Sequence, residues 1–173
     1  MKKFNVLKVF VLVVSFAFVT TVNAQDKNIV ETAISSDAHT TLVAAVKAAD
    51  LVGVLTSAGP FTVFAPTNDA FAKLPEGTVA TLLKPENLAT LQGILKYHVV
   101  AGKFMAADVI ALVKDNNGKA TVTTVNGDTL TISVKKGSVY IKDSKGNSAK
   151  VTAADLDTTN GVIHVIDTVL MPK

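Results

Sequence analysis

The stretch Gly59-Pro-Phe-Thr-Val-Phe-Ala-Pro-Thr-Asn-Asp-Ala-Phe71 places a short apolar run directly before a helix start signal. Phe61 to Phe64 follow a Gly-Pro break and are closed by Pro66, which predicts a short strand. Thr67 then stands at the N-cap position, because its hydroxyl can accept a hydrogen bond from a free backbone N–H of the next turn. Asp69 in that turn favours the positive end of the helix dipole. The stretch therefore predicts a strand that leads at once into a capped helix.

A second stretch, Asn160-Gly-Val-Ile-His-Val-Ile-Asp-Thr-Val-Leu-Met-Pro172, lies near the end of the chain. It is apolar at almost every position from Gly161 to Val169, which predicts a central strand covered on both faces. His164 shares a strand face with the aliphatic residues two positions away, so we expect a core histidine hydrogen-bonded to a neighbour. Asp167 lies on the opposite face, where it is expected to accept backbone or hydroxyl hydrogen bonds. Asn160-Gly161 is expected to form a tight turn.

Between these stretches lies a tyrosine-histidine pair in Leu95-Lys-Tyr-His-Val-Val100. We interpret Tyr97 and His98 as neighbours on a strand, whose side chains point to opposite faces. At least one of the two then faces the core. The apolar residues around them favour a structural role for the pair.

The three segments, in this order and at these separations, resemble the signature of the fasciclin domain over essentially Asn28 to Pro172. The resemblance implies an α+β fold with helices packed against a twisted antiparallel β-sandwich or meander. In animal fasciclin proteins a Tyr-His motif with aliphatic flanks has been proposed to recognise integrins, so the resemblance makes Tyr97, His98, Val99 and Val100 candidate binding residues. The other motif residues are expected to be architectural: Phe61, Phe64, Pro66, Thr67, Asn68, Asp69, Phe71, Asn160, Gly161, His164 and Asp167.

The remaining patterns point to the same class without the resemblance. Apolar residues at helical spacing predict helices in the first half, whereas residues 120–151 alternate at strand spacing around an Asn126-Gly127 hairpin turn. We therefore predict an α+β domain whose second half is an antiparallel meander with one buried face. The helix markers are Ile29, Val30, Ala33 and Ile34; Leu42, Val43, Val46 and Ala49; Leu51 to Ser57; Leu88, Leu91, Ile94 and Leu95; and Ala106, Val109, Ile110 and Val113.

The first 24 residues have the pattern of a secretory signal peptide. Three early lysines precede an apolar run from Val9 to Val19, and Val22-Asn23-Ala24 provides small residues for cleavage. The run is too short for a spanning helix, which needs about 20 residues. We expect residues 1–24 to be removed, residues 25–27 to form a short tail and residues 28–173 to form one fasciclin domain, secreted or retained in the periplasm or cell envelope, with no stable membrane span after cleavage.

Composition excludes several classes of function. The chain has 17 basic residues and 14 acidic residues, and removal of Lys2, Lys3 and Lys8 with the signal peptide leaves equal numbers. The basic residues are all lysine, so the planar fork that arginine offers to phosphate and guanine is missing. We therefore expect no nucleic-acid partner. The chain also has no cysteine, which rules out disulfides and thiolate chemistry.

The sequence gives little support to catalysis, and we predict no catalytic residue, metal site or cofactor. His39, His98 and His164 are far apart along the chain, without a nucleophile elbow, a metal-spaced cluster or a phosphate loop. Asp155-Leu-Asp157 and Asp143 to Asn147 lack the arrangement of a calcium loop, so we expect solvated turns there.

Three functional hypotheses follow. The first is a secreted interaction module, of bacterial type, that adheres to a protein or polysaccharide on a cell surface or in a matrix. The alternative is a carrier of a small apolar ligand in a cleft between helices and sheet. The third and least supported is a hydrolase that uses His98 or His164 with a nearby acid. The sequence leaves the identity of the partner and the oligomeric state open.

Overall fold

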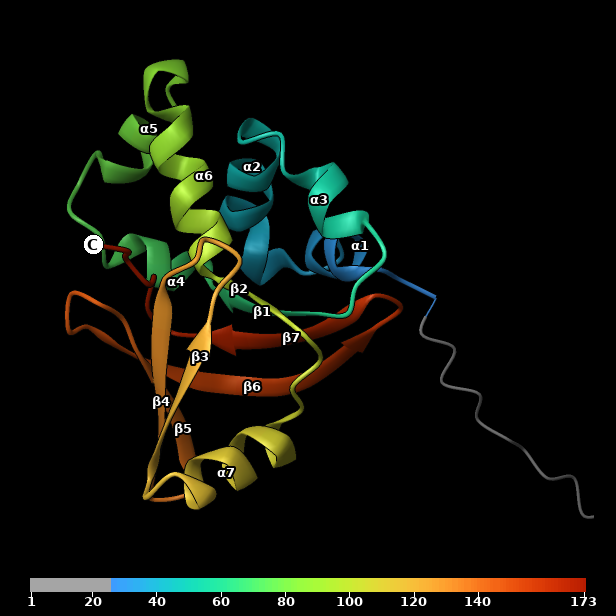
Figure 1. Cartoon of the computed structure of the whole chain (residues 1–173). Coiled ribbons are helices and arrows are strands. Elements are labelled where there is room, and N and C mark those ends of the chain that lie inside the picture. Colours follow the sequence, from blue (N-terminus) through green and yellow to red (C-terminus); the bar gives the residue numbers. More distant parts are fainter. Residues whose placement is uncertain (1–25) are drawn as a thin grey trace, which may run out of the picture.

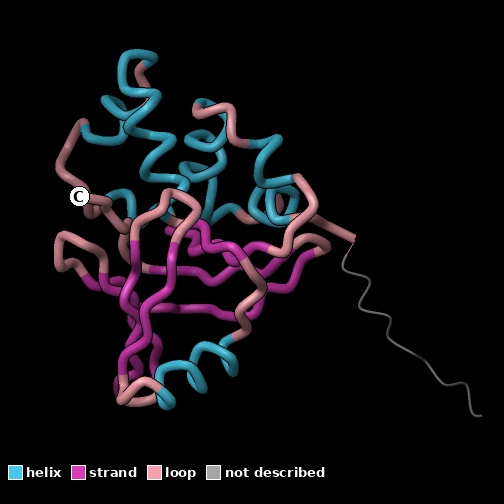
Figure 2. The backbone as a smooth tube through the Cα atoms, viewed as in Figure 1, coloured by secondary structure: helices cyan, strands magenta, loops and turns pink. Residues whose placement is uncertain are grey.

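The computed structural model describes residues 26–173, so the predicted signal peptide lies outside the described residues. Figure 1 shows a seven-stranded sheet with most helices gathered at one end and α7 at the other. Figure 2 shows the same division, with the helices of the first half lying over one end of the strands. The predicted α+β class is confirmed.

The helical elements occupy mainly the first half of the chain. Five segments that the apolar spacing marked are helices, and Thr67 caps α4 by accepting a hydrogen bond from the Ala70 N–H (3.2 Å). The short helix α5 was not predicted, because it buries none of its residues and so has no apolar stripe. The helices are α1 (Ile29–Ile34), α2 (Thr40–Ala48), α3 (Val52–Thr56), α4 (Asn68–Ala72), α5 (Thr78–Leu82), α6 (Leu88–Tyr97) and α7 (Ala106–Asp115), with 3₁₀ turns η1 (Asp37–His39) and η2 (Pro85–Asn87).

The strands form one mixed sheet in the order β2-β1-β7-β6-β5-β4-β3. Its antiparallel meander from β3 to β7 agrees with the expected pattern, but β1 and β7 pair in parallel, which local patterns did not indicate. A bridge between Val100 and Thr124 joins the two ends of the order, so the sheet nearly closes into a barrel. The strands are β1 (Phe61–Pro66), β2 (Val99–Ala101), β3 (Lys119–Thr123), β4 (Thr129–Lys135), β5 (Ser138–Lys142), β6 (Ser148–Thr158) and β7 (Gly161–Ile166).

Side-chain alternation explains the two faces of the meander. In β4, Leu130 and Ile132 are buried, whereas Thr129, the first residue of the strand, is exposed. This alternation is what the two-residue period of a strand requires. The turn between β3 and β4 uses Gly127 at φ 88°, a conformation that glycine adopts at little cost. Strand β6 is irregular, with register shifts on either side of Ala153 and a positive φ of 59° at Asp155.

Two apolar clusters form the core. One packs α1, α2, α3 and α6 against β1 and β7, and the other lies inside the meander under α7. Strand β7 runs between β1 and β6 and is buried at every position, as the apolar sequence from Gly161 predicted. No helix among residues 26–173 has the length and apolar character needed to cross a bilayer.

Candidate functional site

The tyrosine-histidine pair lies at the end of a helix, so its interpretation as a strand segment is wrong. Tyr97 is the last residue of α6 and His98 is its C-cap, with φ −85° and ψ −2°. Strand β2 begins only at Val99. Successive residues at a helix end do not point to opposite faces, and here both side chains are directed inward. Tyr97 is 0% exposed and His98 is 3% exposed.

The Tyr97 hydroxyl joins three parts of the chain. It donates a hydrogen bond to the Thr129 carbonyl (3.2 Å) at the start of β4, and it accepts one from the Ser144 N–H (3.0 Å) after β5. The Ser144 hydroxyl lies 3.1 Å away as a further partner. A buried phenol needs such partners, because an unsatisfied polar atom in the core is costly. Tyr97 therefore fastens α6 to the meander.

His98 joins α6 to the end of the chain. Its Nδ1 donates to the Ile94 carbonyl (2.8 Å), and its Nε2 accepts from the Leu170 N–H (3.0 Å). These two contacts require a neutral ring with the proton on Nδ1. Burial lowers the pKa of His98 to about 4, against the opposing effects of the Ile94 hydrogen bond and the Asp143 charge. Because its Nδ1–H and its Nε2 lone pair are both engaged inside the fold, the ring is not placed to exchange a proton with a substrate.

Val99 and Val100 complete the segment that the resemblance made a candidate binding element. Both are buried, at 6% and 2% exposure. The segment Tyr97–Val100 is therefore interior throughout, and the folded domain does not offer it as a contact surface.

His164 of β7 is held in the core in a similar way. Its Nε2 donates to the Phe104 carbonyl (2.7 Å), and its Nδ1 accepts from the Asp155 N–H (3.3 Å). Its ring stacks on Phe64 of β1 with ring centroids 5.9 Å apart. His164 thus connects β7 to the bulge of β6 and to the segment before α7.

Asn160 and Gly161 connect the start of β7 to the first helices. The Asn160 side chain accepts from the Ile29 N–H (3.0 Å) and donates to the carbonyls of Leu55 (2.8 Å) and Ser57 (3.1 Å). A Cβ on Gly161 would lie 2.1 Å from the Phe61 carbonyl oxygen, so only glycine fits there. The turn is thus a junction of three segments that are distant in sequence.

The residues after β1 have comparable roles. Pro66 and Phe71 are buried, whereas Asp69 is exposed in the first turn of α4. The Asn68 side chain accepts from the Thr41 N–H (3.0 Å) and donates to the Asp37 carbonyl (2.9 Å), which fixes α4 against the start of α2.

Asp167 follows β7 and accepts hydrogen bonds from the Lys150 N–H and the Thr168 hydroxyl, both at 2.9 Å. Burial raises its pKa, but these hydrogen bonds and the charge of Lys73 outweigh burial and hold the pKa of Asp167 below its ordinary value. Lys73 lies 3.8 Å from the carboxylate and also donates to the Asp167 carbonyl (2.6 Å). Asp167 therefore connects β7 to β6 and α4.

The three aspartates expected in solvated turns differ in exposure and in hydrogen bonding. Asp143 is only 5% exposed and accepts from Asn147 and from the Met171 N–H (3.0 Å). Asp155 accepts from the Ala106 N–H (2.7 Å), and Asp157 pairs with Lys103. The expectation of a solvated turn is therefore wrong for the buried Asp143, whereas Asp155 is exposed to solvent but lies, like the half-buried Asp157, in strand β6 rather than in a turn. Within residues 26–173, no cluster of histidine, aspartate or glutamate is placed to hold a metal ion.

His39 is the third buried histidine and was not assigned a role from sequence. Its Nδ1 lies 2.8 Å from the Ser36 hydroxyl, while its Nε2 is buried without a hydrogen-bond partner among the described residues. Burial lowers the pKa of His39 below its ordinary value, against an opposing effect of the Ala65 backbone. The preceding Ser36-Asp37 break was the only local signal for this arrangement.

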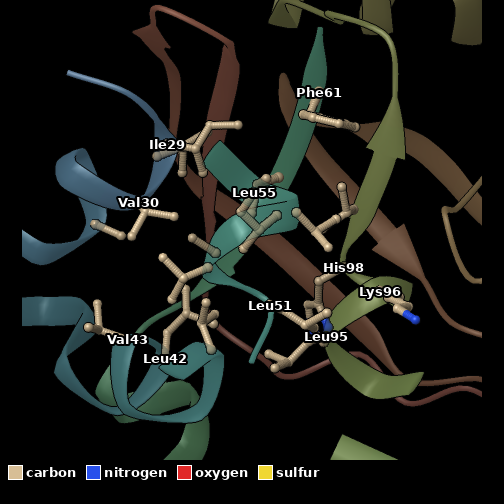
Figure 3. A pocket seen from close by; sticks show the side chains of 18 of the residues that line it. Ile29, Val30, Leu42, Val43, Leu51, Leu55, Phe61, Leu95, Lys96 and His98 are labelled. Atoms are coloured by element: carbon tan, nitrogen blue, oxygen red, sulfur yellow. The ribbon is translucent and has the colours of Figure 1, made fainter. Parts of the chain in front are cut away.

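An apolar cleft lies between the first helices and the sheet, as Figure 3 shows. Its cavity volume is about 50 Å³, and its walls are almost entirely apolar. Val54 and Val125, exposed at 45% and 40%, are among its lining residues, as are Lys47 and Lys96. Representative inner residues are Ile29, Leu42, Leu51, Leu55, Leu95 and Val99.

Comparison with known proteins identifies the family. The model of the fasciclin domain matches residues 37–172, so the chain belongs to the fasciclin-domain family. Proteins of this family are in general adhesion-type proteins without enzymatic activity.

Relatives from bacteria and animals share the domain. Protein sll1483 of Synechocystis is 55% identical over 83% of this chain and 73% of its own length. The transforming growth factor-beta-induced protein ig-h3 of Sus scrofa is 40% identical over 76% of this chain, which spans only 17% of that protein. A solved FAS1 domain pair from the insect cell adhesion molecule Fasciclin I has the same fold, with a TM-score of 0.60 at 24% identity over 73% of this chain and 42% of that structure.

Proposed function

We propose that this chain is a secreted, non-catalytic interaction module that adheres to a cell surface or matrix. The observation that carries the proposal is the bonding of the signature segments: the tyrosine, histidine and asparagine groups that could do chemistry are all engaged inside the fold. Membership of a family of adhesion-type proteins supports the same function. Contact with a partner is then left to the outer surface of the domain.

A single domain of this size binds weakly through one exposed face, so useful adhesion depends on many copies acting together. The test is to immobilise the protein at graded density through one cysteine added after Lys173, which is possible because the chain has no cysteine of its own. We expect retention of cells or matrix that rises steeply with density. No retention above a carrier-protein control at any density would contradict the proposal.

A second candidate function, transport of a small apolar ligand, is favoured by the cleft of Figure 3. Its cavity volume of about 50 Å³ is about a third of the roughly 150 Å³ of an engineered apolar cavity that admits benzene. A larger ligand would therefore require the short helices α1 and α3 to move outward. An apolar pocket of this kind favours apolar guests.

Native mass spectrometry of protein from its natural host tests this second candidate. We expect an added mass that is lost on denaturation and is reduced by Ala33→Phe, which would fill the cleft from α1. Ala44→Phe is the matched control, since Ala44 is exposed on α2 and does not line the cleft. A spectrum without added mass would count against a carrier and leave the adhesion proposal untouched.

A further inference from the structure

The outer surface of the meander has an unusual composition. Register fixes which residues share it: Lys119 pairs with Ser133, Ser133 with Tyr140, and Tyr140 with Lys150, so one row crosses all four strands. Residues directly opposite in antiparallel strands point to the same side of the sheet. We call this surface the outer face of β3–β6. Its residues are Lys119, Thr121, Thr123, Thr129, Thr131, Ser133, Lys135, Ser138, Tyr140, Lys142, Ser148 and Lys150.

This face is open to solvent. Each of its residues is exposed or half-exposed, whereas the residues that alternate with them are mostly buried beneath α7 and the barrel interior. Helix α7 packs on the inner side, because its Val109 and Val113 belong to the apolar cluster inside the meander. Figure 1 shows α7 at the end of the meander away from the other helices, and the exposure of the outer residues shows that no described helix covers them.

The charge on this face is one-sided. Its ionisable side chains are Tyr140 and four lysines, and none of its paired positions holds an acid. Lys119, Lys135, Lys142 and Lys150 form no ion pair with any described residue. The predicted mature chain has equal numbers of acids and bases, so this concentration of positive charge reflects distribution rather than composition.

The ionisable residues around the face leave it with an excess of positive charge. Lys136 and Lys145, in the turns at its two ends, add positive charge. Asp143 after β5 is buried and bonded to Asn147, and Asp167 beside β6 accepts from the Lys150 N–H and faces Lys73. Asp128, in the turn before β4, is bonded by the Asn126 side chain (2.8 Å). The six lysines of the face and its turns thus outnumber these three aspartates, and the excess of positive charge is available to an external anion.

We propose that the outer face of β3–β6 binds an acidic polysaccharide, which gives the partner class of the adhesion function proposed above and rests on it. Lysines present separate, mobile point charges that suit spaced carboxylates or sulfates. The threonine and serine hydroxyls between them can donate to and accept from sugar hydroxyls. Lys119 and Lys150 lie three strand spacings apart, roughly 14 Å, so the row spans several groups of an extended polymer.

Other polyanions fit this face less well. An anionic bilayer is normally held by apolar side chains that insert beside the charges, and the face carries no aliphatic residue. Nucleic-acid recognition normally relies on arginine forks and stacked aromatic rings. This chain has no arginine, and Tyr140, with the Lys135 ammonium 6.0 Å from its ring centroid, is the single aromatic residue of the face.

The experiment measures binding of the exported, purified protein to alginate, a polymer of uronates, with dextran as the neutral polymer. We expect binding to alginate that weakens as salt is added, and no binding to dextran. Replacing Lys119, Lys135, Lys142 and Lys150 with Gln is expected to weaken alginate binding by roughly tenfold or more at low salt, since each exposed charge contributes a modest amount.

A matched variant separates this face from net charge. Replacing Lys27, Lys47, Lys84 and Lys96 with Gln removes the same charge from the helical half, and we expect a change in affinity of less than about threefold. Thr131→Glu, which places one acid in the middle of the face, is expected to weaken binding by several-fold. Equal losses in the two lysine variants, equal binding to dextran, or tighter binding to single-stranded DNA than to alginate would overturn the proposal.

The outcomes also separate this proposal from the adhesion function. If cells are still retained when the four face lysines are replaced, the adhesion function stands but the outer face of β3–β6 is not its binding surface. Alginate binding through this face without retention of cells or matrix would keep the surface and refute adhesion.

Discussion

The signature segments and the outer face of β3–β6 are opposites in how they use polar groups. Tyr97, His98, Asn160 and His164 are distinctive in sequence, and their side chains are bonded within the fold. The outer face is built from ordinary threonine, serine and lysine, and its lysines have no internal ion pair among the described residues. The difference teaches that in this domain the recognisable residues maintain the architecture, while the capacity for contact lies in residues that no motif marks.

The largest expected effect is a loss of stability from a substitution in a buried signature segment. Gly161→Ala would place a methyl group 2.1 Å from the Phe61 carbonyl oxygen. Because that oxygen belongs to the backbone of β1, the clash could be relieved only by moving the backbone. We expect a loss of more than about 3 kcal/mol in the free energy of unfolding, measured by denaturant titration. Gly93→Ala in α6 is the control, because no atom other than those of its chain neighbours and of its own helix backbone lies within 4 Å of the new Cβ. It should stabilise by up to about 1 kcal/mol, and similar results for both variants would contradict the account.

The second prediction concerns the dependence of the free energy of unfolding on pH. The pKa of His98 is lowered by burial from 6.5 to about 4, so the unfolded chain binds a proton between these values while the folded chain does not. Stability should therefore be complete above pH 6.5 and fall as pH decreases toward 4, by roughly 3 kcal/mol at most. His39, whose pKa is also lowered, adds to the same trend. His98→Gln, measured by urea unfolding across this range, should show a smaller slope, and an unchanged slope would exclude His98 as the titrating group.

Asn160→Ala is expected to have an intermediate effect. The substitution removes an acceptor for the Ile29 N–H and a donor to the carbonyls of Leu55 and Ser57, so we expect a loss of about 2 kcal/mol in thermal or denaturant unfolding. Asn116→Ala removes one exposed contact to the Leu112 carbonyl and should cost about 0.5 kcal/mol. If the two asparagines cost the same, the turn at Asn160 is not the junction described.

The smallest effect on stability belongs to the outer face. The four lysines of the face are exposed and form no ion pair with a described residue. The four are Lys119, Lys135, Lys142 and Lys150. Replacing all four with Gln should therefore change the free energy of unfolding by no more than about 0.5 kcal/mol. Calorimetry checks this directly. A loss of several kcal/mol would mean that these lysines stabilise the fold and are not free for a partner.

Local signals in the sequence predicted most elements of the fold. The Thr67 cap, the Asn126-Gly127 turn and the alternation in β4 depend on neighbours within a few residues, and the structure agrees with each. The parallel pairing of β1 with β7 depends on residues about 100 positions apart, and no local pattern encodes it. The resemblance to a family supplied the architecture that periodicity could not.

The candidate site was harder to predict for the same reason. Tyr97 and His98 were interpreted as neighbours on a strand, yet α6 continues through Tyr97. Asp143 resembled a turn residue, but Met171 and Asn147 enclose it. The acid-free face could be recognised only once register had shown which residues of four strands lie side by side.

Hydrogen exchange of the backbone amides tests the central claim most directly, namely that the signature segments are permanent interior structure. The account predicts that amides of Val162–Ile166 and of Val99 and Val100 exchange only through global unfolding, so that their free energy of opening equals that of the whole domain. Exchange of these amides at a clearly lower free energy would show that the segments open locally and can meet a partner, which would contradict the account.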